Sequence, residues 1–179
     1  KLIMLMEKAT QGQVLVDGVN LSRLANSQIP YHRRRVGVVF QNHQLLFDRS
    51  VFENVALPLR ISGYSSRDLE RRVRAALDKV GLLKKEKQSP IELSGGEQQR
   101  IGIARAVVNK PSLILADEPT GNLDPTLSAE IMRLFEQFND VGVSVLIASH
   151  DLPLIDRLNH RVIGLKGGRL LNERPAGGF

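Results

Sequence analysis

The sequence contains no cysteine among its 179 residues, so a disulfide framework and thiolate metal sites are excluded. Tryptophan is also absent, and aromatic residues make up only 4% of the chain, which leaves few side chains on which nucleic acid bases could stack. No apolar run reaches the length of a helix that crosses a bilayer. These residues therefore contain neither a disulfide-stapled scaffold nor a membrane-spanning helix.

A phosphate-binding loop of the form G-x-x-x-x-G-K-[ST] is missing as well between Lys1 and Phe179. The chain does not begin with methionine. Its first residues, Lys1–Met6, have the composition of the middle of a helix and are too short for a signal peptide. We expect Lys1–Met6 to be helical.

The overall composition is that of one globular domain, expected to span residues 1–179. Hydrophobic residues make up 42% of the chain and charged residues 25%, and the net charge is +6. Because the basic residues are spread along the chain, a solvated basic surface is favoured over a nucleic acid site or an anionic membrane surface. Nucleic acid is therefore not expected as a partner.

Three apolar runs have the composition of buried parallel strands: Val36–Phe40, Leu113–Ala116 and Val143–Ala148. Such runs, separated by helical segments, predict an α/β sheet that is covered on both faces. Polar residues follow each run, namely Gln41, then Asp117 with Glu118, then Ser149 with His150. Since ligands of open α/β sheets bind beyond the carboxyl ends of the strands, these side chains are expected to share one site.

The segments between these runs carry helix and turn signals. Ser66–Val80 places its apolar residues on one face and is followed by Gly81, a common residue after a helix end. Asp124 and Pro125 are typical of an N-cap and a first helical position. We also expect an edge strand, a hairpin and an inserted helical subdomain, at Gln13–Asp17, at Val162–Leu165 with Arg169–Leu171, and at Asn42–Glu92, respectively.

The segment Leu93–Arg100 reads Leu-Ser-Gly-Gly-Glu-Gln-Gln-Arg. Ser94 and Glu97 fit a capping box, and helix capping alone would explain them. Two adjacent glycines each cost about 1 kcal/mol in a helical turn relative to alanine, which indicates that something must approach the backbone closely. A phosphate bound to the helix N-terminus is one such group. Ser94, Gly95, Gly96 and Glu97 are therefore candidate nucleotide-binding residues.

Asp117 and Glu118 end the second apolar run. As neighbours on one strand, their side chains are expected to point in opposite directions, so that one can hold Mg²⁺ through water while the other addresses an attacking water. Two adjacent buried carboxylates without a cation would be unfavourable. The alternative is an exposed strand end that carries two solvated acids.

Three further candidates are weak alone. Gln41 can offer its amide to Mg²⁺ or water, and His150 can bond a γ-phosphate oxygen and orient the water. A lone histidine at a strand end is more often structural, and Asp124 is explained as a helix cap. The occurrence of all these residues at strand ends, in this order, favours a nucleotide site.

Together these segments resemble ABC-transporter ATPases over essentially the whole chain. Leu93–Arg100 resembles their signature motif, Leu113–Glu118 the Walker B strand with its catalytic glutamate, and Gly121–Asp124 the D-loop. Gln41 resembles the Q-loop glutamine and His150 the switch histidine. The resemblance implies a P-loop NTPase-like α/β fold with a mostly parallel sheet, an inserted helical subdomain, and ATP and Mg²⁺ as cofactors.

This resemblance implies ATP hydrolysis in a head-to-tail homodimer. Asp117 and Gln41 would hold Mg²⁺, Glu118 would be the catalytic base or water-positioner, and His150 would bind the γ-phosphate. Ser94–Glu97 would meet ATP bound to the other subunit, and Asp124 is grouped with these nucleotide-binding residues. Family members also carry N-terminal strands and a Walker A loop, which are absent here. We therefore expect an N-terminally truncated domain that is inactive by itself.

Within the family, Glu97–Arg100 and Gly121–Asp124 resemble a group that includes ATPases of cell division, lipoprotein release and drug efflux. Within that group, three further segments favour the branch that acts in bacterial cell division and cell-wall remodelling: Phe40–His43, Ala75–Leu83 and Ala104–Pro111. That branch implies an integral membrane partner and a peripheral position on the cytoplasmic face of the inner membrane. One alternative is an ATPase of lipoprotein release or drug efflux, and another is a non-catalytic regulatory module that keeps only the signature half-site. A DNA-repair ATPase would require a long coiled-coil insertion, which the sequence lacks.

Overall fold

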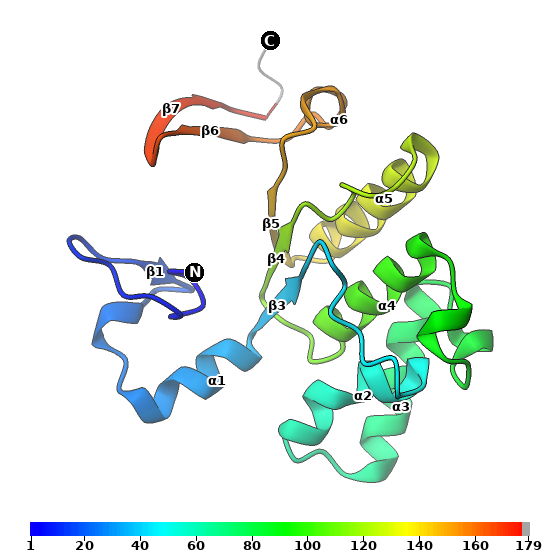
Figure 1. Cartoon of the computed structure of the whole chain (residues 1–179). Helices are drawn as coiled ribbons and strands as arrows, with labels where there is room; N and C mark the ends of the chain where they lie inside the picture. The colour runs from blue at the N-terminus through cyan, green and yellow to red at the C-terminus, as the bar shows by residue number, and fades with distance from the viewer. Residues whose placement is uncertain (177–179) are drawn as a thin grey trace. The chain divides into compact units, whose positions relative to one another are not determined.

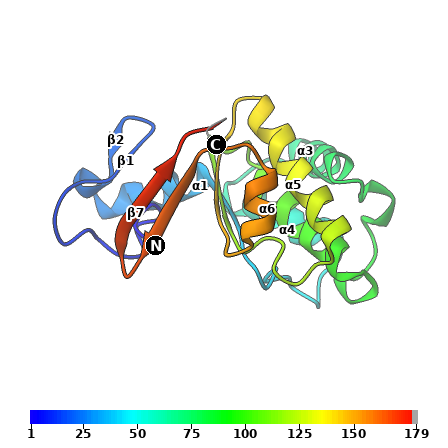
Figure 2. The same cartoon turned by 90° about the horizontal axis from the view of Figure 1, so that it is seen from above.

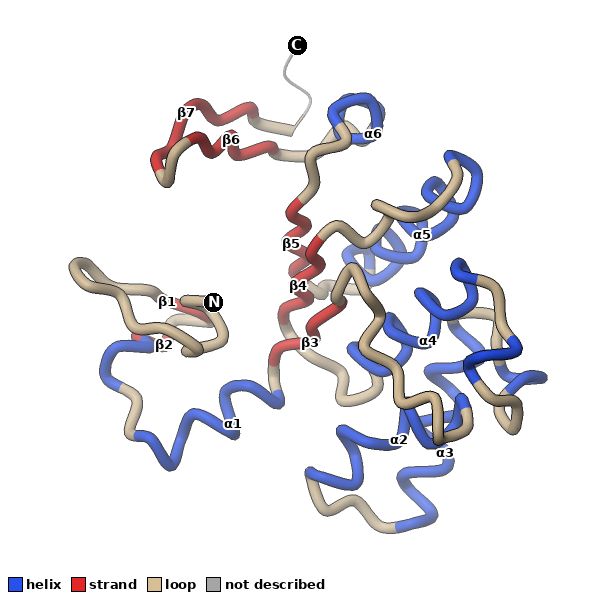
Figure 3. Tube along the Cα trace, in the orientation of Figure 1, coloured by secondary structure: helices blue, strands red, loops and turns tan. Residues whose placement is uncertain are grey.

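The computed structural model describes residues 1–176, and the chain falls into two compact units, Lys1–Ile147 and Ala148–Phe179. Figures 1 and 3 show the elements in chain order. The strands are β1 (Leu15–Val16), β2 (Val19–Asn20), β3 (Val36–Val39), β4 (Leu113–Asp117), β5 (Ser144–Ala148), β6 (Val162–Lys166) and β7 (Arg169–Arg174). The α-helices are α1 (Ile29–Arg34), α2 (Val51–Ile61), α3 (Ser66–Lys79), α4 (Gly95–Val107), α5 (Pro125–Asp140) and α6 (Leu152–Arg157). Short 3₁₀ helices are η1 (Leu21–Arg23), η2 (Asn26–Gln28), η3 (Leu83–Lys85) and η4 (Pro90–Glu92).

The central sheet of the first unit has the strand order β3-β4-β5. β3 and β4 are parallel, with Val36 opposite Leu113 and Val39 opposite Ala116. The three predicted apolar strands are therefore confirmed, with ends that differ by one residue. Val39 and Ile114 are buried, as expected for strands in the middle of an α/β domain.

Helices α2, α3, α4 and α5 lie on one side of this sheet, whereas α1 lies on the other (Figures 1 and 2). α4 contacts β3, and α2 and α3 contact both α4 and each other. The buried side chains of this layer include Val55, Leu59, Leu77, Ile101 and Ile103. The predicted end of α3 is confirmed, because Gly81 follows it with φ of +73°. Gly142 follows α5 in the same way, with φ of +91°. Asn42–Glu92 is helical without a strand, as expected, and its limits as a subdomain stay a prediction.

The expected burial of the third strand is wrong. No residue of β5 is buried, and the Leu146 side chain is 47% exposed. An apolar run predicts burial from both faces, but the order β3-β4-β5 leaves β5 with one neighbouring strand among the described residues. Its apolar side chains are therefore only partly covered.

The expectation that Lys1–Met6 is helical is also wrong. These residues form turns, with Leu5 N donating to Leu2 O at 3.0 Å and Leu5 at φ +49°. The positive φ of Leu5 is incompatible with a right-handed helix, which requires negative φ at each residue.

The predicted edge strand at Gln13–Asp17 is shorter than expected. β1 pairs with β2 in an antiparallel hairpin of its own and is not an edge of the central sheet. Asp17 and Gly18 both have positive φ, which fits the two-residue turn of such a hairpin.

The second unit contains α6 and the predicted hairpin. β6 and β7 pair antiparallel around Gly167 and Gly168, and β7 extends beyond the predicted Leu171 to Arg174. Both glycines have positive φ, which a tight hairpin turn requires. Over residues 1–176, none of the helices has both the length and the apolar character needed to cross a membrane.

Candidate functional site

The N-terminus of α4 is a complete capping box. Ser94 Oγ accepts from the backbone N of Glu97 at 3.3 Å, and Glu97 Oε2 accepts from the backbone N of Ser94 at 3.1 Å. The capping interpretation of Ser94 and Glu97 is therefore confirmed. Binding of a phosphate at the same helix end stays a prediction.

The two glycines of this helix start have different surroundings. A Cβ on Gly96 would lie 3.1 and 3.3 Å from the methyl carbons of Leu127, in the first turn of α5, whereas a Cβ on Gly95 would meet nothing within 4 Å. Gly96 therefore permits close packing of α4 against α5. Packing does not explain Gly95, and its face of the helix start is open to an incoming group.

Lys85 neutralises the carboxylate at this helix end. Its Nζ donates to Glu97 Oε1 at 2.5 Å from the 3₁₀ helix η3. The hydrogen bond from Lys85 is the main cause that lowers the pKa of Glu97, and burial opposes it. Sequence reasoning did not identify Lys85. The only signal available was its place in a basic pair nine residues before Ser94.

The parallel register of β3 and β4 brings Gln41 and Glu118 to the same level. Val39 pairs with Ala116, and Gln41 and Glu118 each follow their strand residue by two positions. The loops that carry Gln41 and Glu118 both lie close to Gly121. A Cβ on Gly121 would be 3.2 Å from Gln41 Nε2 and 3.6 Å from Glu118 Cβ. The structure thus brings together Gln41 and Glu118, as the strand-end argument predicts.

Glu118 does not continue the strand. β4 ends at Asp117, and Glu118 has φ +45°, in the left-handed region. The expectation that the two acids alternate as strand neighbours is therefore wrong. A non-glycine residue in this region costs about 1–2 kcal/mol, and such strain is commonly found at functional sites.

The carboxylates of Asp117 and Glu118 are more accessible to solvent than the apolar residues of β4 would suggest. Asp117 is exposed and Glu118 half-buried, so an incoming cation could reach Asp117. In residues 1–176 no group of three or more histidine, aspartate or glutamate side chains could hold a metal. Mg²⁺ at Asp117 and Gln41 stays a prediction, and it would need ligands from nucleotide or water.

Asp124 caps α5. Its Oδ1 accepts from the backbone N of Thr126 at 2.9 Å and of Leu127 at 3.1 Å. The cap interpretation of Asp124 is therefore confirmed, and its grouping with nucleotide-binding residues stays a prediction. Because Gly96 packs on Leu127, the starts of α4 and α5 are neighbours, and Ser94–Glu97 and Asp124 lie at adjacent helix ends.

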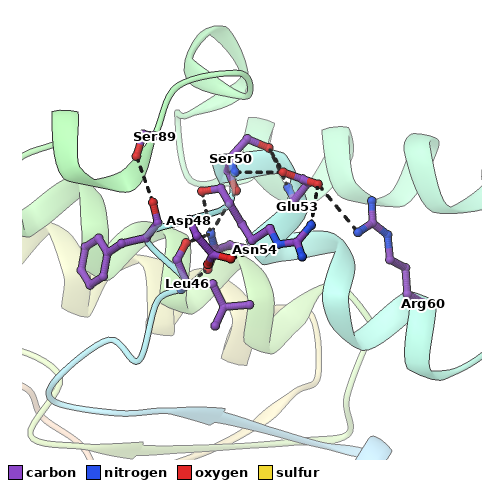
Figure 4. Close-up of polar contacts among 9 residues, drawn as sticks. Leu46, Asp48, Ser50, Glu53, Asn54, Arg60 and Ser89 are labelled. Carbon is purple, nitrogen blue, oxygen red and sulfur yellow. Dashed lines mark hydrogen bonds and ion pairs between the residues drawn. The ribbon is translucent and has the colours of Figure 1, made fainter.

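Buried Asn54 fixes the segment that follows the Gln41 loop (Figure 4). Its Oδ1 accepts from Leu46 N at 2.8 Å, and its Nδ2 donates to Leu46 O at 2.9 Å and Ser50 O at 3.0 Å. Ser50 and Glu53 form a second capping box, at the start of α2. Sequence reasoning missed this anchor, although a Ser-x-x-Glu spacing was present.

His150 belongs to the second unit. It follows β5, is exposed, and its carbonyl accepts from Leu152 N at 3.0 Å. Asp151 caps α6 by accepting from Leu154 N at 3.1 Å. The predicted role of His150 at a γ-phosphate stays a prediction.

The comparisons with known proteins agree on one family. A family model described as ABC transporter matches residues 1–121. The "Cell division ATP-binding protein FtsE" of Escherichia coli (strain K12) is 58% identical over 170 residues, which are 95% of this chain and 77% of that protein. The protein of the same name from Bacillus subtilis (strain 168) is 42% identical over 179 residues, 100% of this chain and 78% of that protein.

Two solved structures are similar over nearly all of the chain. The ATP-binding cassette MJ0796, in a dimeric post-hydrolysis state bound to ADP and Pi, is 35% identical with a TM-score of 0.84. That comparison covers 99% of this chain and 78% of the cassette. cbiO1 from Clostridium perfringens, part of the ABC transporter complex cbiONQ, is 28% identical with a TM-score of 0.87, covering 96% of this chain and 68% of cbiO1.

Proposed function

The chain belongs to the ABC transporter family, and from this membership we propose that it is the ATP-binding and ATP-hydrolysing part of an FtsE-type complex that acts in bacterial cell division. The observation that carries the proposal is the identity of 58% and 42%, over 95% and 100% of this chain, to the cell-division ATP-binding proteins of Escherichia coli and Bacillus subtilis. The meeting of Gln41 and Glu118 beyond β3 and β4 supports it.

The residues present fit ATP and Mg²⁺. The open face of Gly95 leaves the backbone of the α4 N-terminus accessible to a phosphate, which helix N-termini favour. Asp117 and Gln41 offer a carboxylate and an amide oxygen, and Mg²⁺ is commonly bound by one or two carboxylates together with substrate phosphates and water. A site with few protein ligands is therefore sufficient.

We assign the roles as follows. Asp117 and Gln41 hold Mg²⁺, which when bound neutralises charge on the transferred phosphoryl group. Glu118 positions the attacking water and accepts its proton, and His150 binds the γ-phosphate. Ser94–Glu97 bind the phosphate of ATP held by a second copy, next to Asp124. Positioning and charge neutralisation provide most of the catalysis in phosphoryl transfer, so closure of the dimer would start hydrolysis.

The proposed partners are a second copy of the chain and an integral membrane protein of the FtsX type. The dimeric state of the MJ0796 cassette supports the first partner, and the names of the FtsE relatives support a role in cell division. The helical region Asn42–Glu92 follows Gln41 directly and would transmit closure to the membrane partner. We propose a peripheral position on the cytoplasmic face of the inner membrane.

The test uses a chimera in which the Walker A segment of Escherichia coli FtsE precedes Lys1. We expect the chimera to hydrolyse ATP, and we expect Glu118→Gln to lower kcat by about 10²-fold or more, since general base catalysis contributes that much. Glu70→Gln on α3 is the matched control and should leave kcat unchanged. The measurement is phosphate release at saturating MgATP.

The 179-residue chain without that segment is the second control. Because it contains no G-x-x-x-x-G-K-[ST] loop, we propose that it binds MgATP weakly and hydrolyses none. Full hydrolysis by Glu118→Gln would contradict the assigned role of Glu118. An inactive chimera would favour a non-catalytic regulatory module, and tight MgATP binding by the 179-residue chain in calorimetry would contradict its proposed inactivity.

A further inference from the structure

The loop that carries Gln41 has an unusual backbone. His43 N donates to Phe40 O at 3.2 Å, which closes a turn with Gln41 at its second position. Immediately after it, His43 and Gln44 both have φ of +47°. Two consecutive non-glycine residues in the left-handed region are unfavourable by themselves, so neighbouring groups must stabilise this conformation.

Arg105 of α4 supplies that stabilisation. Its Nη2 donates to His43 O at 2.5 Å and its Nη1 to Gln44 O at 2.7 Å. The two donors of one planar guanidinium thus hold the carbonyls of the two left-handed residues. Burial lowers the pKa of Arg105, but an arginine remains charged at neutral pH, so these are charge-assisted hydrogen bonds.

A second contact joins the same loop to the same helix face. His43 Nδ1 lies 2.5 Å from Oε1 of the buried Gln99. Gly102 is one helical turn further along, where a Cβ would lie 4.0 Å from His43 O. Gln99, Gly102 and Arg105 are spaced three residues apart, so they share one face of α4.

We propose that Arg105 is a positioning residue for Gln41. By holding the carbonyls of His43 and Gln44, Arg105 keeps the turn closed and presents the Gln41 side chain beside Glu118. This inference rests on the proposed function only for the role of Gln41 as a Mg²⁺ ligand. The dependence of the loop conformation on Arg105 is a property of the chain alone.

The first experiment measures amide hydrogen exchange in the 179-residue chain. Arg105→Lys keeps the positive charge but cannot place two donors in a planar fork, so amides of residues 41–46 should exchange about tenfold faster or more. Amides of α3 and α5 should be unchanged. The matched control is Arg133→Lys, at an exposed arginine of α5, and it should alter neither region.

A second-site variant separates positioning from general packing. Asparagine adopts the left-handed region more readily than glutamine, so Gln44→Asn added to Arg105→Lys should return most of the loop protection. If Arg105→Lys does not fold, Gln44→Val tests the same point from the loop side, because a β-branched residue disfavours positive φ. Unchanged exchange at residues 41–46 in either single variant would overturn the proposal, as would a double variant without restored protection.

A functional measurement connects the loop to chemistry. In the chimera, Arg105→Lys should raise the Mg²⁺ concentration for half-maximal hydrolysis about tenfold, with a smaller change in kcat at saturating Mg²⁺. Faster loop exchange with an unchanged Mg²⁺ requirement would overturn the link to Gln41. An inactive parent chimera would instead contradict the proposed function, and the exchange result would still decide whether Arg105 holds the loop.

Discussion

At the scale of single residues, the adjacent Gly95 and Gly96 differ in the space available for a larger side chain. Gly96→Ala would press a methyl group against Leu127, and we expect it to lower the free energy of unfolding by about 1 kcal/mol. Gly95→Ala meets open space and gains helix propensity, so it should raise that free energy by about 0.5 kcal/mol. Urea unfolding of both variants measures the difference.

The same two variants also separate packing from function. If glycine at position 95 lets a phosphate approach the backbone, Gly95→Ala should lower the rate of ATP hydrolysis by the chimera while it stabilises the chain. Equal stability changes in the two variants would contradict the different surroundings described for the two glycines.

Residue roles were predictable where they depend on local chain chemistry. The caps at Ser94 and Asp124 follow from side chains that reach backbone groups two or three residues away, and these caps are confirmed. Roles that depend on distant segments were not predictable. Arg105 contacts a loop about sixty residues earlier in the chain, and nothing in its neighbours indicates this. The left-handed Glu118 likewise results from the turn that leads to Gly121.

At the scale of elements, α4 begins with an ion pair that makes its stability depend on pH. Lys85 lowers the pKa of Glu97 in the folded chain below the usual value of about 4.3, so the folded state binds this proton less readily than the unfolded state. The stabilisation is therefore present above the unfolded pKa and is lost as pH falls through the folded pKa.

The variant Glu97→Gln tests this dependence, because glutamine can keep the capping box but cannot form the ion pair. Between pH 7 and pH 3 the parent chain should lose about 1 kcal/mol more unfolding free energy than Glu97→Gln. Glu70→Gln, in an exposed pair with Arg74, is the control and should behave as the parent does. Parallel pH profiles for parent and Glu97→Gln would contradict the role of Lys85.

Helices and strands were predicted correctly where the spacing of apolar residues agreed with capping residues or glycines at the ends of the element. α3 and α5 each have an apolar face, an N-cap and a following glycine. Both predicted ends of α3 are confirmed within one residue, and so is the predicted start of α5 at Asp124 and Pro125. Lys1–Met6 has apolar residues without end signals, and its predicted helix is wrong. For β5 the strand is correct and its burial wrong, because burial depends on neighbouring strands that no local pattern reports.

At the scale of the whole molecule, the predicted P-loop NTPase-like α/β class is confirmed by the similarity to the MJ0796 cassette and cbiO1. The fold class was accessible because several motifs occur in a fixed order along the chain. The arrangement that makes one site depends instead on strand register and on loops anchored by Asn54 and Arg105. These contacts between distant segments could not be read from sequence order.

The exposed apolar edge at β5 predicts self-association of the 179-residue chain. Unpaired, apolar edge strands promote intermolecular pairing, and a lysine on such an edge opposes it. At concentrations on the order of 10 µM we expect association that Leu146→Lys reduces. The control Val141→Lys places the same charge at an exposed residue beyond the end of α5.

Sedimentation velocity over a range of concentrations measures this association. A monomeric parent chain would contradict the prediction, as would equal effects of Leu146→Lys and Val141→Lys. In the latter case added charge alone would explain the improved solubility.

Because β3 and β4 pair in a parallel register, part of the chain between them can be replaced by the corresponding part of a relative. Gln41 and Glu118 are aligned by strand pairing and not by the length of chain that joins them. The stretch from α3 to η4 can therefore be grafted from a relative, with insertions or deletions, while the spacing of the two side chains is kept. This stretch can thus be replaced as a module, provided that the loop anchored by Asn54 and Arg105 is left intact.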